Sequence, residues 1–99
     1  MVFESLFESA QKGELILING GFCRYHMRTD RQLTIKEIIS TRKGAGSEML
    51  AMLTALKPYY ILAKCPADLE ANKWYEKKGF KVIGTEKAKS GRLINIWVK

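Results

Sequence analysis

The sequence is poor in the residues that build metal and redox centres. It contains two cysteines, Cys23 and Cys65, and one histidine, His26. The cysteines do not stand at a metal-binding or redox spacing, and a single histidine adds no zinc-ligand pattern. We therefore expect two reduced, partly buried thiols and no metal site. A nucleophilic pair of Cys23 and His26 is an alternative, but the pattern supplies no third group to orient the histidine.

Long apolar runs are also missing. No stretch approaches the roughly 18–20 apolar residues that span a membrane, and residues 1–6 lack the basic-then-apolar pattern of a secretory signal. Repeats, linkers and low-complexity segments are absent. We therefore expect one domain over residues 1–99, located in the cytoplasm, without a membrane partner. Because a chain of 99 residues buries only a modest core, we also expect a homodimer.

Acidic residues are scarce toward the C-terminus. Residues 73–99 contain eight Lys or Arg against two Glu, whereas residues 1–72 contain nine basic against eight acidic side chains. Most of the formal net charge of +7 therefore lies in the C-terminal third. A charge of this kind favours an anionic partner, such as a polyphosphate cofactor, an acidic substrate or a nucleic acid, although it also serves solubility alone.

Apolar periodicity and turn residues predict nine helices and strands. Helices are expected over 2–12, 44–57 and 69–78, and strands over 14–19, 22–28, 33–40, 59–65, 80–85 and 93–98. The first three strands should form an antiparallel meander. The fourth should lie parallel to the third, because a helix crosses over between them. The last two should form a hairpin. The predicted fold class is α/β (α+β), with a mixed, mostly antiparallel sheet flanked by helices in the order α-β-β-β-α-β-α-β-β.

The residues of the three predicted helices give one further prediction for each helix. The first helix should present an apolar face made of Phe3, Leu6, Phe7 and Ala10. The second should bury a stripe made of Met49, Leu50, Leu53 and Leu56. Asp68 should cap the start of the third helix, because its side chain can accept a hydrogen bond from a free backbone N–H there.

Two segments carry the functional signal. In residues 37–47 a strand runs through a Gly-containing turn into a helix, a geometry that offers free N–H groups and a positive helix end to an anion. In residues 71–80, with the sequence ANKWYEKKGF, a helix stops at a glycine and a strand follows. In this order and spacing the two segments resemble the GNAT-type acetyltransferases over residues 14–99. Members of that family usually carry a further strand and helix at the N-terminus, so the resemblance implies either that part of the substrate-side wall is missing or that a second subunit supplies it.

The resemblance implies acetyl-CoA as cosubstrate. The family binds the cofactor's pyrophosphate on a Gln/Arg-x-x-Gly-x-Gly/Ala loop, which corresponds to residues 41–46 here, with Thr41 in the first place and Arg42 next to it. The pantetheine arm would lie along the backbone of residues 38–40. Asn72 would hydrogen-bond that arm from the later helix. The implied cofactor-binding residues are Ile38, Ile39, Ser40, Arg42, Lys43, Gly44, Ala45, Gly46, Ser47 and Asn72.

Two residues are candidates for the chemistry. Tyr75 occupies the place of the family's usual general acid, which protonates the departing thiolate. The alternative is a core aromatic that anchors the helix to the sheet, and packing is the expected role of Trp74. Glu37 is the best candidate for the base that deprotonates the amine, because it interrupts an apolar alternation and should share a face with Ile35 and Ile39. The alternative for Glu37 is an ion pair with a neighbouring-strand arginine, Arg24 or Arg28.

The implied activity is direct acetyl transfer to a primary amine of a small molecule, protein or peptide, without an acyl-enzyme. Two other functions stay open. The fold could bind CoA without catalysis. It could also be a basic nucleic-acid-binding domain that uses the lysines of its C-terminal third, although it lacks the motifs of the common single-strand-binding modules, so a nucleic-acid partner is not favoured.

Overall fold

The computed structural model describes residues 2–99, except for the side chains of Val2, Phe3, Ser5, Leu6 and Ser9. Three helices and six strands follow one another in the predicted order. Their bounds are α1 Val2–Gln11, β1 Leu15–Ile18, β2 Gly21–Met27, β3 Gln32–Ser40, α2 Ala45–Ala55, β4 Tyr60–Pro66, α3 Ala71–Lys77, β5 Lys81–Lys87 and β6 Leu93–Val98.

The six strands form one mixed sheet in the order β1-β2-β3-β4-β6-β5. The predicted meander of β1, β2 and β3 is confirmed, and so is the terminal antiparallel hairpin of β5 and β6. β3 and β4 pair in parallel, as expected for strands joined by a helical crossover. The sheet is therefore antiparallel everywhere except at its centre.

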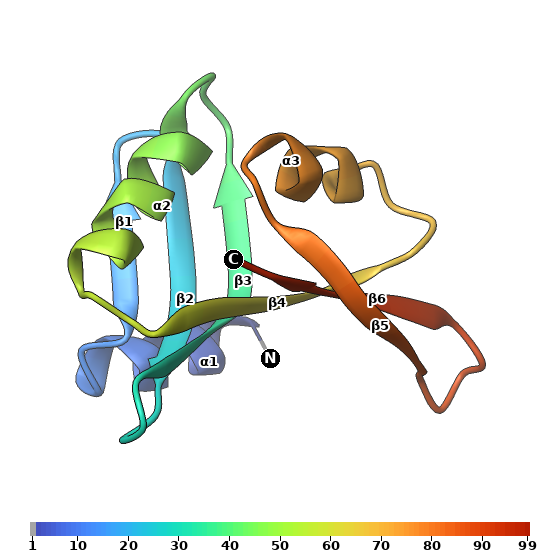
Figure 1. The fold of residues 1–99 in the computed structure, drawn as a ribbon. Helices are drawn as coiled ribbons and strands as arrows, with labels where there is room; N and C mark the ends of the chain where they lie inside the picture. Colours follow the sequence, from blue (N-terminus) through green and yellow to red (C-terminus); the bar gives the residue numbers. More distant parts are fainter. Residues whose placement is uncertain (1) are drawn as a thin grey trace.

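The parallel pairing at the centre is short, and the sheet opens beyond it. Residues 32–35 of β3 pair with residues 60–63 of β4. Further along, β3 stays beside β2 up to Ser40, whereas β4 turns to β6 and stays with it up to Pro66. Figure 1 shows the two halves of the sheet diverging from this point, with α3 beside the opening.

A bulge in β3 coincides with the point of divergence. Tyr25 of β2 pairs with Ile35 and Arg24 pairs with Glu37, so Lys36 is an extra residue without an opposite partner. An extra residue bends its strand and increases the local twist. We infer that Lys36 helps to turn the end of β3 away from β4 and so opens the sheet.

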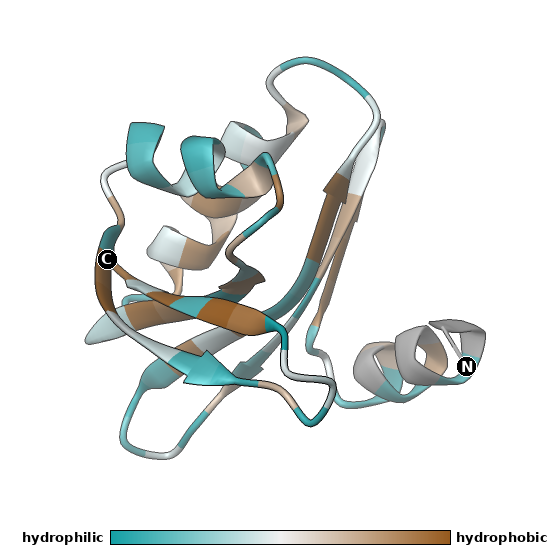
Figure 2. Cartoon of the chain, turned by 90° about the vertical axis from the view of Figure 1, so that its right-hand side faces the viewer, coloured by the Kyte–Doolittle hydropathy of each residue, from teal (hydrophilic) through white to brown (hydrophobic). Residues whose placement is uncertain are grey.

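Helices α2 and α3 lie on one side of the sheet and α1 lies on the other (Figure 2). The core forms between the sheet and the side that carries α2 and α3, where Leu33, Met49 and Leu53 are fully buried. The predicted stripe of α2 is confirmed for Met49, Leu50 and Leu53. It is wrong for Leu56, whose side chain is 40% exposed, because the helix ends one residue earlier and Leu56 is its C-cap.

The predicted cap of α3 is wrong. The helix begins at Ala71 after Glu70, and no side chain caps it. Asp68 instead accepts hydrogen bonds at 3.1 and 3.0 Å from Nε and Nη2 of Arg92, in the loop before β6. The attraction between these two charges explains why the carboxylate faces the neighbouring strand instead of the helix end.

The apolar face predicted for α1 is described only in part. The side chains of Phe3 and Leu6 lie outside the described part of the structure, and those of Phe7 and Ala10 are exposed. Within residues 2–99 no helix has the length and apolar character needed to cross a membrane.

Candidate active site

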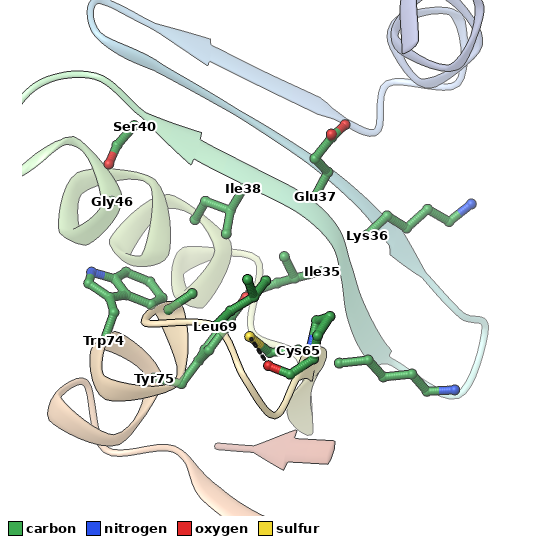
Figure 3. A pocket seen from close by; sticks show the side chains of 13 residues that line it. Ile35, Lys36, Glu37, Ile38, Ser40, Gly46, Cys65, Leu69, Trp74 and Tyr75 are labelled. Carbon is green, nitrogen blue, oxygen red and sulfur yellow. Dashed lines mark hydrogen bonds between the residues drawn. The ribbon is translucent and has the colours of Figure 1, made fainter. Parts of the chain in front are cut away.

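A cavity of about 370 Å³ fills the opening between β3 and β4, beneath α3 (Figure 3). We call it the cleft. It is lined by Ile35, Lys36, Glu37, Ile38, Ser40, Gly46, Lys64, Cys65, Pro66, Leu69, Ala71, Trp74 and Tyr75. Both sequence segments that carry the functional signal contribute to this lining, although they lie about thirty residues apart in the chain.

The edge of β3 inside the cleft has no strand beside it. In an antiparallel pair the backbone groups of successive residues point alternately toward the partner strand and away from it. Thr41 donates its N–H to the Gly20 carbonyl at 2.7 Å, which places the groups of Ile39 toward β2 and those of Ile38 and Ser40 toward the cleft. Ile38 and Ser40 therefore present free backbone groups to the cleft, and Ile39 does not.

Tyr75 enters the cleft from α3. Its side chain is 6% exposed and packs against Trp97 and Phe80, with ring centroids 6.0 and 5.2 Å apart. Among residues 2–99 no group hydrogen-bonds to its hydroxyl, and the oxygen is not fully enclosed. Burial raises the pKa of Tyr75 to about 12, with smaller contributions from Cys65 and Cys23. The residue thus anchors the helix and also keeps a neutral, unpartnered proton donor in the cleft.

Glu37 does not share a face with Ile35, and this prediction is wrong. The extra residue Lys36 shifts the alternation of β3, so that Ile35 and Ile38 both face the helices whereas Glu37 lies on the opposite side. Figure 3 shows the Glu37 carboxylate directed away from Tyr75. The alternative of an ion pair with Arg24 is confirmed, with 3.6 Å between Arg24 Nε and Glu37 Oε1. That Nε atom is buried and has no hydrogen-bond partner.

A second cavity, of about 440 Å³, adjoins the cleft at the start of α2. We call it the basic cavity. Its lining residues are Ser40, Arg42, Lys43, Gly44, Gly46, Ser47, Trp74, Lys77 and Lys78. Ser40, Gly46 and Trp74 line both cavities, so the two spaces are neighbours. Four basic side chains around one cavity indicate an anionic ligand.

The backbone of the loop adds unused donors to the basic cavity. Within the described chain the N–H groups of Lys43, Gly44, Gly46 and Ser47 donate to no acceptor, whereas the Ala45 N–H bonds to the Arg42 carbonyl at 3.1 Å. Such free groups at a helix start carry a partial positive charge. Ala45 is buried and does not line either cavity.

The two glycines of the loop are needed for different reasons. Gly44 has a φ of 88°, which other residues rarely adopt. Gly46 has no such conformation, but a Cβ atom there would lie 3.0 Å from Cζ2 of Trp74. The first glycine therefore permits the turn, and the second permits the close approach of α3 to the start of α2.

Arg42 is already engaged by protein groups. Its Nε donates to the Asn19 carbonyl at 3.0 Å, and its Nη2 donates to Glu48 Oε2 at 2.9 Å. The guanidinium lines the basic cavity but shares its charge with Glu48. Lys43, Lys77 and Lys78 form no ion pair within the described residues, so they supply most of the available positive charge.

Asn72 lies outside both linings, and its amide is fully used. Nδ2 donates to the carbonyls of Pro66 and Leu69 at 2.8 and 2.7 Å. Oδ1 accepts from Asn95 Nδ2 at 3.1 Å and from Trp97 Nε1 at 2.9 Å. These four bonds join the start of α3 to β4 and β6, so the geometry favours a structural role over contact with a cofactor.

The sequence did not identify several residues that line the cleft, among them Cys65 and Leu69. It predicted Trp74 only as a packing residue. For Lys77 and Lys78, which line the basic cavity, the concentration of positive charge after residue 72 could have indicated a role in the site. The Cys65 thiol donates to the Pro66 carbonyl at 3.6 Å, and burial raises its pKa. Burial raises the pKa of Cys23 to about 12. Both thiols are buried and unpaired, which does not favour nucleophilic chemistry.

Metal chemistry finds no support in the arrangement of the side chains. Within the part of the chain that the structure describes, no group of three or more His, Cys, Asp or Glu could share a metal ion. His26 instead contacts Glu14, with 2.6 Å between Nδ1 and Oε2.

Comparison of the fold with solved structures returns acetyltransferases. A GNAT-family acetyltransferase from Bacillus cereus superimposes with a TM-score of 0.77 at 19% identity, over 93% of this chain and 73% of that chain. The ribosomal-protein-S18-alanine N-acetyltransferase from Escherichia coli gives 0.70 at 18%, over 96% and 74%. An aminoglycoside 6′-N-acetyltransferase complexed with coenzyme A gives 0.72 at 11%, over 93% and 76%.

The likeness is one of structure. No protein-family model and no curated protein sequence matches the chain. Against four further solved structures, the chain spans 55–62% of their length. On the strength of these superpositions, the chain has the fold of the GNAT-type acetyltransferases.

Proposed function

We propose that this chain is an acetyl-CoA-dependent N-acetyltransferase that transfers an acetyl group directly to a primary amine. One observation carries the proposal. The cleft holds an unpartnered phenol and a free strand edge, and it adjoins a basic cavity at a helix start. An extended thioester with an anionic end fits that combination.

The two cavities match the two ends of acetyl-CoA. The free N–H groups of Gly46 and Ser47, with Lys43, Lys77 and Lys78, suit its diphosphate. The amide-rich pantetheine arm would add as a strand to the edge at Ile38 and Ser40. The thioester then lies in the cleft near Tyr75. Solved neighbours in complex with acetyl-CoA or CoA support this choice of cosubstrate.

The chain's own residues divide the proton transfers. Glu37, directly or through a water molecule, takes the proton of the incoming amine so that its nitrogen can form the new C–N bond. Tyr75 donates its phenolic proton to the sulfur as the C–S bond breaks, and solvent restores that proton. The products are the N-acetylated amine and free CoA, and no acyl-enzyme is needed.

The opposite placement of the two side chains suits this chemistry. Tyr75 lies on the helix side of the sheet, and the Glu37 carboxylate lies on the other side. An arm that runs between β3 and β4 separates these sides. We therefore place the entrance for the amine on the Glu37 side, so that the base meets the amine and the acid meets the sulfur.

Calorimetric titration with acetyl-CoA tests the proposal first, and release of free thiol in the presence of a panel of amines tests it second. Micromolar binding together with amine-dependent thiol release is the expected result. Binding without thiol release for any amine would favour the non-catalytic CoA-binding alternative. No binding at millimolar acetyl-CoA would refute the proposal, and salt-dependent binding of an oligonucleotide would then favour the nucleic-acid alternative.

We also propose that the chain forms a homodimer. The side chains of Leu17, Phe22 and Ile39 stand in register across β1, β2 and β3, and Leu17 and Ile39 are 75% and 43% exposed. A row of apolar side chains of this kind favours association. Light scattering should give about twice the chain mass of 11.3 kDa, and the variant Leu17→Lys should shift the mass toward the monomer. A wild-type mass of one chain would contradict the proposal.

A further inference from the structure

Trp74 stands between the cleft and the basic cavity. It lines both spaces, and Figure 3 shows its indole ring beside the first turn of α2. The ring packs so closely on Gly46 that a Cβ atom there would lie 3.0 Å from Cζ2 and 3.3 Å from Nε1. The ring nitrogen therefore lies next to the start of α2.

The indole N–H of Trp74 is an unused donor. Among residues 2–99 no acceptor bonds to it, and the nitrogen is not fully enclosed. The other tryptophan provides a contrast, because Nε1 of Trp97 donates to Asn72 Oδ1 at 2.9 Å. A buried or half-buried indole N–H usually finds a partner. The nitrogen of Trp74 is therefore free to donate to a ligand that enters the cleft or the basic cavity.

Neighbouring groups indicate what the acceptor is. The free N–H groups of Gly46 and Ser47 lie at the same helix start, and Lys43, Lys77 and Lys78 surround the same cavity. Arg42 contributes less, because Glu48 and the Asn19 carbonyl hold its guanidinium. The donors that remain are the three lysines, the backbone N–H groups and the indole, and together they suit the oxygens of a phosphate group.

We propose that Trp74 is a cofactor-binding residue whose Nε1–H donates a hydrogen bond to the diphosphate of acetyl-CoA. The inference rests on the proposed function and assigns this tryptophan a role beyond packing. Trp74 replaces the side-chain donor that Arg42 gives up to Glu48. The same ring also forms the wall at which the anionic end of the ligand meets its extended arm.

The first test uses the wild-type protein and the ¹H–¹⁵N resonances of its two indole groups. Acetyl-CoA should shift the Trp74 Nε1–H resonance downfield, and S-acetylpantetheine, which lacks the diphosphate, should leave it nearly unchanged. The Trp97 resonance is the internal control, because its N–H is already bonded to Asn72. An unchanged Trp74 resonance at saturating acetyl-CoA would overturn the inference.

The second test compares binding by wild type and by Trp74→Phe, which keeps an aromatic ring but removes the N–H. A hydrogen bond to a charged group accounts for about 10–100-fold in affinity. The variant should lose that much for acetyl-CoA and little for S-acetylpantetheine. Equal losses for both ligands, or no loss, would overturn the inference while leaving the proposed function standing. If wild type itself binds no acetyl-CoA, the proposed function fails, and this inference fails with it.

Discussion

At the scale of single residues, the site depends on which groups are already satisfied. Arg42 and Asn72 are both polar and near the cavities, yet their polar atoms already form hydrogen bonds with other groups of the protein. Tyr75 and Trp74 are largely apolar side chains, yet their polar atoms have no partner among the described residues. Ligand contacts are therefore expected from the aromatic residues more than from the obvious polar ones.

Replacing Tyr75 by Phe should lower the rate of acetyl transfer by about 10–100-fold, because the thiolate then leaves without a proton from the enzyme. Affinity for acetyl-CoA should change little. Steady-state kinetics together with calorimetric titration measure both quantities. Tyr25→Phe is the matched control, since Tyr25 is also buried and donates to the Gly13 carbonyl at 3.1 Å, away from the cleft. Equal turnover of Tyr75→Phe and wild type would reduce Tyr75 to packing.

Glu37 shows where residue-level prediction stops. An ion pair with Arg24 or Arg28 could be predicted as the alternative to a base role, because a carboxylate between isoleucines on a strand must be paired or perturbed. The direction of the side chain could not. A two-residue alternation assumes a regular pleat, and one extra residue, Lys36, reverses the faces beyond it. No local pattern marks such a bulge, because its cause lies in the pairing of separate strands.

At the scale of elements, the sequence predicted type and order well, and ends less well. Helices and strands follow from apolar spacing and from turns at Gly20, Gly44 and Gly79, all of which have positive φ. The start of α3 was misplaced, because Asp68 has a stronger partner in Arg92 than in a helix end. Such a competition joins residues that are distant in sequence, so local rules cannot anticipate it.

The end of α2 offers a prediction of increased stability. Lys57 follows the C-cap Leu56 and has a φ of 56°, a conformation that costs a residue with a Cβ atom. Lys57→Gly should therefore raise the free energy of unfolding by about 0.5–1 kcal/mol. Its carbonyl, which accepts from Arg31, is retained. Urea denaturation measures the change.

The control for Lys57→Gly is Ala51→Gly, at an exposed position in the interior of the same helix. Glycine there should lower the free energy of unfolding by about 1 kcal/mol. Opposite signs for the two variants are the expected result. Destabilisation by Lys57→Gly of the same size as Ala51→Gly would show that the left-handed conformation at Lys57 carries no cost.

Asn72 holds the junction of α3 with β4 and β6. Its replacement by Ala removes four hydrogen bonds and leaves the Trp97 N–H without its partner. We expect a loss of about 2–4 kcal/mol in the free energy of unfolding, measured in urea. Asn95→Ala, which removes one of the four bonds, should cost much less. If the two variants cost the same, the junction does not depend on Asn72.

At the scale of the whole molecule, the divided sheet creates the site. β3 and β4 pair over four residues and then separate, and the cleft occupies the gap. The fold class, the parallel centre and the glycine-containing turn from β3 into α2 could all be predicted from the sequence. The width of the gap and the residues of α3 that project into it, such as Trp74, could not, because they depend on how the two halves of the sheet are tilted.

The buried core also makes a prediction about alkaline stability. Burial raises the pKa of Cys23 and of Tyr75 to about 12, from ordinary values of 9.0 and 10.0. In the folded chain both groups stay neutral up to the raised pKa values, whereas in the unfolded chain they ionise at their ordinary values. Their contribution to stability is therefore complete below about pH 9 and is lost as the pH rises from 9 to 12.

Urea denaturation between pH 8 and pH 11 measures this loss, and the variant Cys23→Ala isolates the part that the thiol contributes. The variant should be less stable than wild type at pH 8, because it leaves a cavity in a fully buried position. Its stability should nevertheless fall less steeply above pH 9, since one ionisable group no longer opposes folding at high pH. Parallel stability curves for the two proteins would show that the Cys23 thiol titrates alike in the folded and unfolded chain. The burial of Cys23 would then have no bearing on alkaline unfolding, and the decline would have to come from Tyr75, Tyr25 and Cys65, whose pKa values burial also raises.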